Sequence, residues 1–118
     1  MMREEMPIQE WVEEFPSAIT VCDGRGKIIV MNKASRLNYA KRGGESLIGT
    51  SLFDCHSEAS NKIIRKMLQK EIDQAYFTEN KGKKRLVHQA PWFNNGISAG
   101  LVETIVDLPG DIEVRKRS

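Results

Sequence analysis

Cysteine is scarce in this chain of 118 residues: only Cys22 and Cys55 are present, and they form no CxxC pair. Two isolated cysteines fit a reducing cytoplasm, and a domain of this length can bury a core without disulfides or metals. Long apolar runs are also missing, since the longest have about four residues against the ~20 that cross a bilayer. No apolar segment follows the acidic start, so a signal peptide is not expected. The composition predicts a soluble, cytoplasmic protein without a membrane partner.

The chain also has no large excess of positive or negative charge. The formal net charge is +2, and basic residues alternate with acidic ones except at 81–85 and 115–117. Neither cluster is broad enough to form a basic face, so no nucleic-acid partner is expected. The apolar fraction of 40% and the charged fraction of 29% are those of an ordinary globular protein. The length fits one domain, and no repeat or low-complexity linker divides it.

Apolar spacing predicts a short helix at the start of the chain, from Pro7 to Phe15. Ile8, Trp11, Val12 and Phe15 follow the i, i+3, i+4, i+7 pattern of one helical face. This face either packs on the sheet of the same chain or forms a dimer interface. We favour the dimer interface, because so short a helix cannot bury the face alone and aromatic anchors are enriched in interfaces.

The clearest local signal is a β-hairpin over residues 18–31. Two runs rich in β-branched residues, 18–22 and 27–31, flank a turn with the sequence Asp-Gly-Arg-Gly. Asn32 follows the second run directly and can cap a helix with its side-chain oxygen. A pair of glycines at 43–44 then ends that helix.

A long helix and a strand meander are predicted in the second half of the chain. Apolar residues at helical spacing predict a helix over 57–75. Turns rich in Asn and Gly separate the strands that follow. Strands are expected at 76–78, 85–93 and 99–108. Strands at both ends of the chain with helices between them predict an α+β fold, with one antiparallel sheet and helices on one face.

These segments resemble the PAS family from about Ile8 to Pro109. Residues 19–32 (ITVCDGRGKIIVMN) are similar to that family's opening hairpin, 46–54 (SLIGTSLFD) to its connector, and 90–108 (APWFNNGISAGLVETIVDL) to its closing hairpin. The last segment is particularly similar to small bacterial PAS sensor proteins.

The resemblance implies a five-stranded antiparallel sheet in the order 2-1-5-4-3, with the middle helices closing a cavity against one face. It also implies an N-terminal amphipathic helix, which often mediates dimerisation in this family. The expected divisions are an N-terminal helix over 1–16, a PAS domain over 17–109 and a basic C-terminal tail over 110–118.

Two residues, His56 and Cys55, are candidate cofactor ligands. Some PAS domains bind haem through a histidine in the general region of His56. The favoured interpretation is a polar residue near a helix N-terminus, hydrogen-bonded to a neighbour. No second ligand follows at a helical spacing, so a haem or metal sensor is a minor alternative. Light-sensing relatives carry their flavin-attacking cysteine where this chain has Leu52, three positions before Cys55, so flavin chemistry is not expected. The sequence requires no cofactor.

The expected cavity lining comes from the middle helices and the last two strands. Strand alternation groups His88 with Trp92, and Glu103 with Leu101 and Ile105, but either group can point inward because both faces are partly apolar. A buried His88 or Glu103 needs a partner, which a ligand could supply. The alternative is a filled core without a cavity. The candidate pocket residues are Tyr39, Phe53, His56, Ile64, Met67, His88, Trp92 and Glu103.

No catalytic pattern is recognised: the sequence has no Ser/His/Asp order, phosphate-binding glycine loop, HExxH motif or paired carboxylates. An enzyme is therefore not expected. We expect a sensory or regulatory module that binds a small molecule beside its sheet. Such a module would act in signal transduction, for example in the regulation of transcription. Its output would pass through a homodimer or a separate effector protein. The alternative is a ligand-free protein-interaction module.

Overall fold

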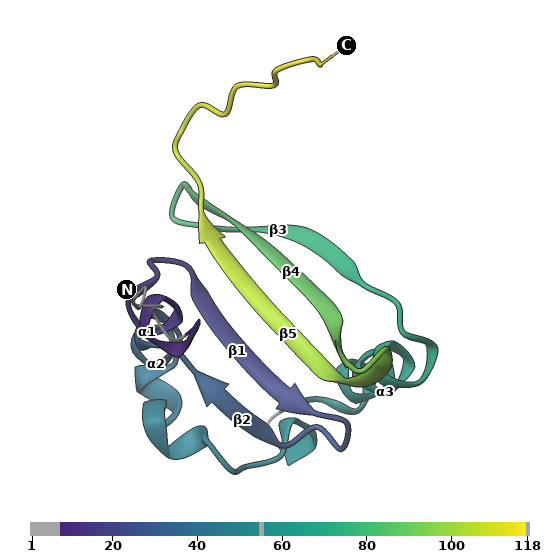
Figure 1. Cartoon of the computed structure of the whole chain (residues 1–118). Coiled ribbons are helices and arrows are strands. Elements are labelled where there is room, and N and C mark those ends of the chain that lie inside the picture. The colour runs from purple at the N-terminus through teal and green to yellow at the C-terminus, as the bar shows by residue number, and fades with distance from the viewer. Residues whose placement is uncertain (1–7, 55, 118) are drawn as a thin grey trace, which may run out of the picture.

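The protein folds as one antiparallel sheet of five strands in the order β2-β1-β5-β4-β3 (Figure 1). The computed structural model describes residues 8–54 and 56–117. The strands are β1 (Ala18–Asp23), β2 (Ile28–Met31), β3 (Gln74–Asn80), β4 (Lys83–Asn94) and β5 (Ile97–Asp107). The helices are α1 (Ile8–Glu14), α2 (Lys33–Asn38) and α3 (Glu58–Lys70), and the short 3-10 helices are η1 (Ala40–Arg42), η2 (Gly44–Leu47) and η3 (Leu52–Asp54). The predicted α+β class and strand order are confirmed.

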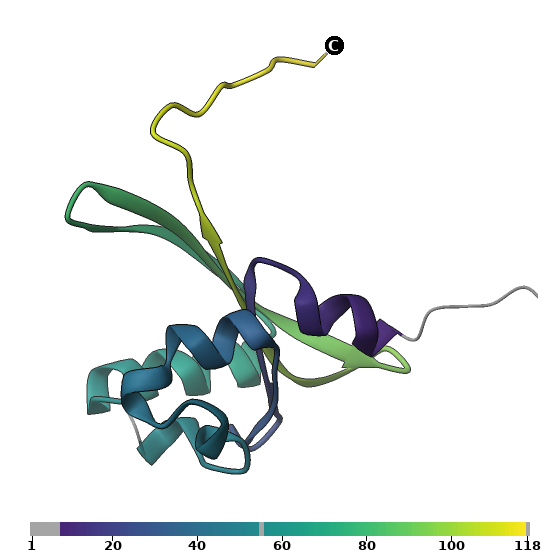
Figure 2. The ribbon, with the colours of Figure 1, turned by 90° about the vertical axis from the view of Figure 1, so that its left-hand side faces the viewer.

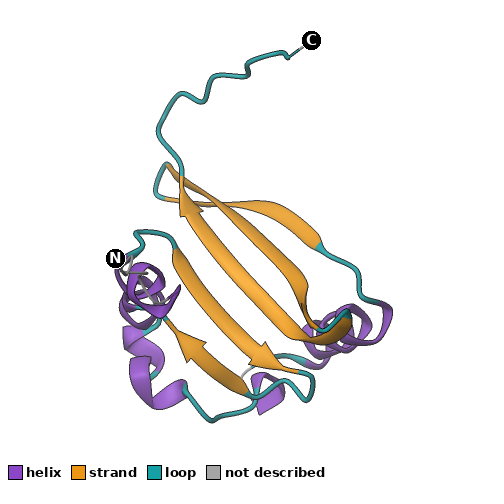
Figure 3. Ribbon diagram, in the orientation of Figure 1, coloured by secondary structure: helices purple, strands orange, loops and turns teal. Residues whose placement is uncertain are grey.

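The helices divide between the two sides of the sheet. Figure 2 shows α2 and α3 together on one side, with α1 on the other side near β1. Figure 3 shows that the helices gather at one end of the sheet and leave the far end of the β3–β4 hairpin without a helix. Within the described residues, no helix is long and apolar enough to span a membrane.

The β1–β2 hairpin forms where the sequence predicts it. Asp23 organises the turn, because its Oδ1 accepts hydrogen bonds from the backbone amides of Arg25 (2.9 Å) and Lys27 (3.0 Å). Gly26 takes a positive φ of 84°, a conformation that glycine adopts without steric cost. The Asp-x-x-Gly turn therefore encodes both a side-chain anchor and the one residue that needs a left-handed backbone.

Asn32 joins three elements and caps α2 as predicted. Its Oδ1 accepts from the amide of Ser35 at 3.0 Å, which is the N-cap bond, and from the amide of Ile19 at 2.9 Å. Its Nδ2 donates to the carbonyls of Val12 and Ser17, both at 2.9 Å. The fully buried side chain thus fixes the end of α1, the start of β1 and the start of α2 against one another.

The core lies between the sheet and its helix-covered face. One buried cluster contains Cys22, Ile64, Met67 and Leu101, and a second contains Ala18, Val87 and Ile105. Burial raises the pKa of the Cys22 thiol, so this cysteine packs as a small neutral hydrophobic residue.

Helix α3 is shorter than the sequence predicts. It ends at Lys70, because Glu71 takes a left-handed conformation with φ 54°. The predicted continuation to residue 75 is wrong: Ile72 is outside the helix, and the following strand β3 begins at Gln74 in order to pair with Gln89. The helical spacing of apolar residues extends past the end of α3 because Ile72, in the connection, and Ala75, in β3, fall at the same spacing.

Candidate functional site

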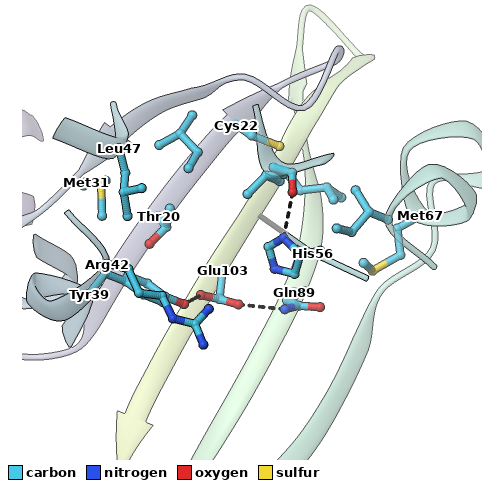
Figure 4. A pocket seen from close by; sticks show the side chains of 14 residues that line it. Thr20, Cys22, Met31, Tyr39, Arg42, Leu47, His56, Met67, Gln89 and Glu103 are labelled. Carbon is cyan, nitrogen blue, oxygen red and sulfur yellow. Dashed lines mark hydrogen bonds between the residues drawn. The ribbon is translucent and has the colours of Figure 1, made fainter. Parts of the chain in front are cut away.

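A cavity of about 130 Å³ lies between the sheet and the helices that cover it (Figure 4). Strands β1, β2, β4 and β5 supply its floor. Its roof comes from α3 and from five residues that precede it: Tyr39, Arg42, Leu47, Leu52 and His56. Most of its wall is apolar. The lining residues are Thr20, Cys22, Ile28, Met31, Tyr39, Arg42, Leu47, Leu52, His56, Ile64, Met67, Gln89, Leu101 and Glu103.

A row of polar side chains crosses the sheet at the floor of the cavity. In the strand register Thr20 faces Glu103, Glu103 faces Gln89, and Gln89 faces Gln74. Paired residues point to the same face of a sheet, so the four side chains lie side by side. The Nε2 of Gln74 donates to Oε1 of Gln89 at 2.6 Å, and the Nε2 of Gln89 donates to Oε2 of Glu103 at 2.7 Å.

Tyr39 closes the other side of this network. Tyr39 is the C-cap of α2. Its hydroxyl donates a hydrogen bond to Oε1 of Glu103 at 2.6 Å. Burial raises the pKa of Tyr39, and the negative charge of Glu103 and the hydrogen bond to it raise that pKa further. The phenol therefore stays a neutral donor, and each oxygen of Glu103 is held by one neutral group (Figure 4).

His56 lies at the roof of the cavity with a fixed orientation. Its Nδ1 is 2.7 Å from the carbonyl oxygen of Leu52. Because a carbonyl only accepts, Nδ1 carries the proton of the neutral ring and Nε2 carries the lone pair. Such a nitrogen can bind a metal or accept a hydrogen bond.

Haem does not fit the cavity as folded. Pockets for drug-sized ligands have volumes of about 300–1,000 Å³, well above the 130 Å³ found here, and a haem is at least of that size. Among the described residues, no three His, Cys, Asp or Glu side chains converge as metal ligands. Cys55, the candidate residue for flavin chemistry, lies outside the described residues.

The sequence profile of the PAS fold matches residues 12–108, most of the chain. The chain belongs to the PAS family. No curated protein sequence matches it significantly.

Solved PAS structures share the fold at low sequence identity. The PAS domain of a Colwellia psychrerythraea protein matches with a TM-score of 0.61 and 18% identity, covering 85% of this chain and 92% of that one. The PAS domain of Bordetella pertussis BvgS matches with a TM-score of 0.60 and 15% identity, covering 86% and 84%. The Aer2 receptor of Vibrio cholerae, described as a dual PAS-haem oxygen sensor, matches with a TM-score of 0.59 and 14% identity, covering 79% and 95%.

Five of the eight candidate pocket residues lie on the wall of the PAS cavity: Tyr39, His56, Ile64, Met67 and Glu103. Their role in binding a ligand stays a prediction. The other three candidates lie elsewhere, and each has an identifiable reason.

His88 points away from the cavity, and its assignment to the pocket is wrong. Its neighbour Gln89 faces Glu103 in the register, so alternation places His88 on the opposite face with its own partner Thr104. The Nε2 of His88 instead lies 3.4 Å from Oδ2 of Asp73. His88 and Glu103 could therefore never share one face, because they are one position out of register.

Trp92 and Phe53 are also absent from the cavity wall. Trp92 belongs to the same strand face as His88, and its indole nitrogen donates to the carbonyl of Cys22 at 3.0 Å. Phe53 packs beside the core cluster that contains Cys22, and the guanidinium of Arg65 lies over its ring at 4.9 Å. Both aromatic residues therefore contact other parts of the fold than the cavity wall.

Sequence reasoning missed Gln89 and Arg42. Gln89 is a polar residue between Val87 and Pro91 on one face of β4, but only the strand register shows that this face meets the cavity. Arg42 carried no local signal. It follows α2 in η1, and its position at the cavity depends on the turn that η1 makes after Tyr39.

Proposed function

We propose that this PAS domain is a sensory module that binds a small molecule in the cavity and passes its occupancy to a partner through α1. The observation that carries the proposal is the carboxylate of Glu103, which projects from the centre of the sheet into an apolar cavity. A core that served only for packing would place an apolar side chain here, because an ionised group beside apolar walls is costly. Its Tyr39 and Gln89 partners keep it oriented toward the space where a ligand would lie.

Helix α2 supports the transmission step. One end of this six-residue helix holds Tyr39 against Glu103, and the other end begins at Asn32, which is bonded to the end of α1. The guanidinium of Arg36, in the same helix, pairs with Glu13 of α1 at 2.6 Å. A ligand that changes the position of Tyr39 therefore biases α1 by as much as its affinity differs between the two arrangements.

The apolar face of α1 supports a homodimer as the output. Trp11 and Phe15 contact each other edge to face with ring centroids 5.7 Å apart, yet 48% and 40% of their surfaces stay exposed. The side chain of Ile8 lies outside what the structure describes. Since α1 lies on the side of the sheet that α2 and α3 leave uncovered, a second copy of this chain could cover both surfaces.

The test is native mass spectrometry of gently purified protein, followed by thermal denaturation against a metabolite panel. A co-purifying small molecule, or a compound that raises the melting temperature in proportion to its concentration, supports sensing. The variant Glu103→Leu should lose this response and keep its fold. Protein that carries no small molecule and responds to no compound would favour the alternative function, a ligand-free interaction module.

A further inference from the structure

One anion and one cation lie together at the cavity, and this pairing constrains the ligand. Glu103 and Arg42 both line it, and Figure 4 shows both side chains next to the end of Tyr39. We propose that the cavity binds a free α-amino acid with a compact apolar side chain, its ammonium group on Glu103 and its carboxylate on Arg42. This inference rests on the proposed function of the cavity as the sensing site.

Glu103 lacks a cationic partner. Its two oxygens accept hydrogen bonds only from the neutral groups of Tyr39 and Gln89, and among the described residues no ion pair involves it. Each carboxylate oxygen can accept a second hydrogen bond. An ammonium group supplies both the donors and the positive charge that this half-buried carboxylate lacks.

Arg42 offers the complementary charge. Within residues 8–54 and 56–117, no carboxylate forms an ion pair with its guanidinium. Its positive charge is close enough to Tyr39 to act on the ionisation of that phenol. A guanidinium presents a planar set of donors that matches a carboxylate in two parallel hydrogen bonds.

The closeness of the two charges favours a zwitterion over a singly charged ligand. A simple amine would be attracted by Glu103 and repelled by Arg42, and a simple carboxylate would meet the reverse. An α-amino acid carries its two charges on a single carbon. It therefore satisfies both side chains from one position beside Tyr39. This residue contacts Glu103 and lies three positions before Arg42, the last residue of η1.

The remaining wall sets the size of the ligand side chain. Apolar groups of Leu52, Ile64, Met67 and Leu101 surround the space beyond the charged pair. An engineered apolar cavity of about 150 Å³ accommodates benzene, so the 130 Å³ found here accepts an aliphatic chain of similar or smaller size. The side chain of leucine has four carbon atoms, fewer than benzene, and meets this limit.

The test uses the wild-type chain and three matched compounds in isothermal titration calorimetry. L-Leucine carries both charged groups, 3-methylbutylamine lacks the carboxylate, and 4-methylpentanoate lacks the ammonium group. Leucine should bind at least about tenfold more tightly than either analogue, the difference expected from one charge-assisted hydrogen-bonded contact. If the amine binds as tightly as leucine, the assignment of Arg42 to the carboxylate is wrong. If the acid binds as tightly as leucine, the assignment of Glu103 to the ammonium group is wrong.

Variants assign the two contacts separately. Glu103→Gln should weaken the binding of leucine and the amine by about tenfold or more and should not weaken the binding of the acid, which Glu103 repels. Arg42→Gln should weaken the binding of leucine and the acid and should not weaken the binding of the amine. Lys41→Gln is the matched control, because it removes a neighbouring positive charge from outside the cavity wall. A loss of leucine binding in the control equal to that of Arg42→Gln would overturn the role of Arg42.

The failure of this inference is distinguishable from the failure of the proposed function. If leucine and compact apolar amino acids do not bind but a neutral probe such as phenol does, the cavity is a binding site and the amino-acid assignment is wrong. If neither the amino acids nor any compound of a broad metabolite panel binds, the sensing function itself is wrong.

Discussion

The hydroxyl of Tyr39 donates to Oε1 of Glu103 across 2.6 Å, and this bond joins the end of α2 to the middle of β5. Two further hydrogen bonds join α2 to the sheet: Arg85 of β4 donates to Asn38 at 2.6 Å, and the hydroxyls of Thr20 and Ser35 lie 2.6 Å apart. The same α2 is anchored at its other end by Asn32, so the helix connects the cavity to α1 without an intervening loop. The expected consequences can be measured one at a time.

Tyr39 should stay un-ionised at a pH where an exposed tyrosine loses its proton. Burial and the charge of Glu103 raise the pKa of Tyr39 above its ordinary value of 10.0. Because the unfolded chain then loses this proton first, the free energy of unfolding should fall as the pH rises above about 10. Tyrosinate absorbance in the variant Tyr76→Phe isolates the signal, since the chain has two tyrosines. A midpoint near the ordinary value would contradict the buried contact.

Asn32 should be more important to α1 than to α2. Asn32→Ser keeps a good N-cap for α2 but loses the amide that donates to the carbonyls of Val12 and Ser17. Hydrogen exchange should speed up in α1 and change little in α2. Asn32→Ala removes both functions and should lower the free energy of unfolding by about 2–4 kcal/mol in urea denaturation. Equal exchange of α1 in wild type and Asn32→Ser would contradict the tether.

Gly100 should tolerate no side chain. A Cβ at this position would collide with the carbonyl oxygen of Cys22 on the neighbouring strand, and its φ of 150° is rare for other residues. Gly100→Ala should lower the free energy of unfolding by about 3 kcal/mol or more, since the central strands must separate. The control is Gly96→Ala, at a turn with open space around it, where the positive φ alone should cost about 1 kcal/mol. Similar losses in both variants would contradict this account of strand spacing.

Trp11 should be required for self-association. Trp11→Ala removes the larger ring of the exposed pair on α1, so the dimer should dissociate at concentrations where the wild type stays associated. Sedimentation equilibrium measures this directly. Phe93→Ala removes an exposed aromatic ring from the end of β4 and should leave the association constant unchanged. A monomeric wild type would rule out the homodimer.

The parts of the fold that could be predicted are those encoded by short stretches of sequence. The β1–β2 turn depends on Asp23 and two glycines within four residues, and the α2 cap depends on Asn32 and its neighbour three positions later. The end of α3 could not be predicted in this way. Glu71 is neither glycine nor asparagine, yet it takes a left-handed conformation, and β3 begins three residues later opposite Gln89.

The cavity was only partly predictable, because strand register decides which side chains share a face. Alternation grouped Glu103 with Leu101 and Ile105 correctly, yet a single strand carries no information on which face meets the helices. The pairing of Gln89 with Glu103 settles this and at the same time excludes His88. Long-range pairing of this kind depends on residues far apart in the chain, which local patterns do not encode.

The polar row has a directional character that extends beyond the cavity. Glu103 has only acceptor atoms when ionised, so it dictates that Gln89 turns its amide nitrogen inward and its oxygen outward, which in turn orients Gln74 on the edge strand β3. Neutralising that carboxylate would free both amides to reverse. The orientation of the Gln74 amide at the edge of the sheet therefore depends on whether Glu103, at the centre of the sheet, is ionised.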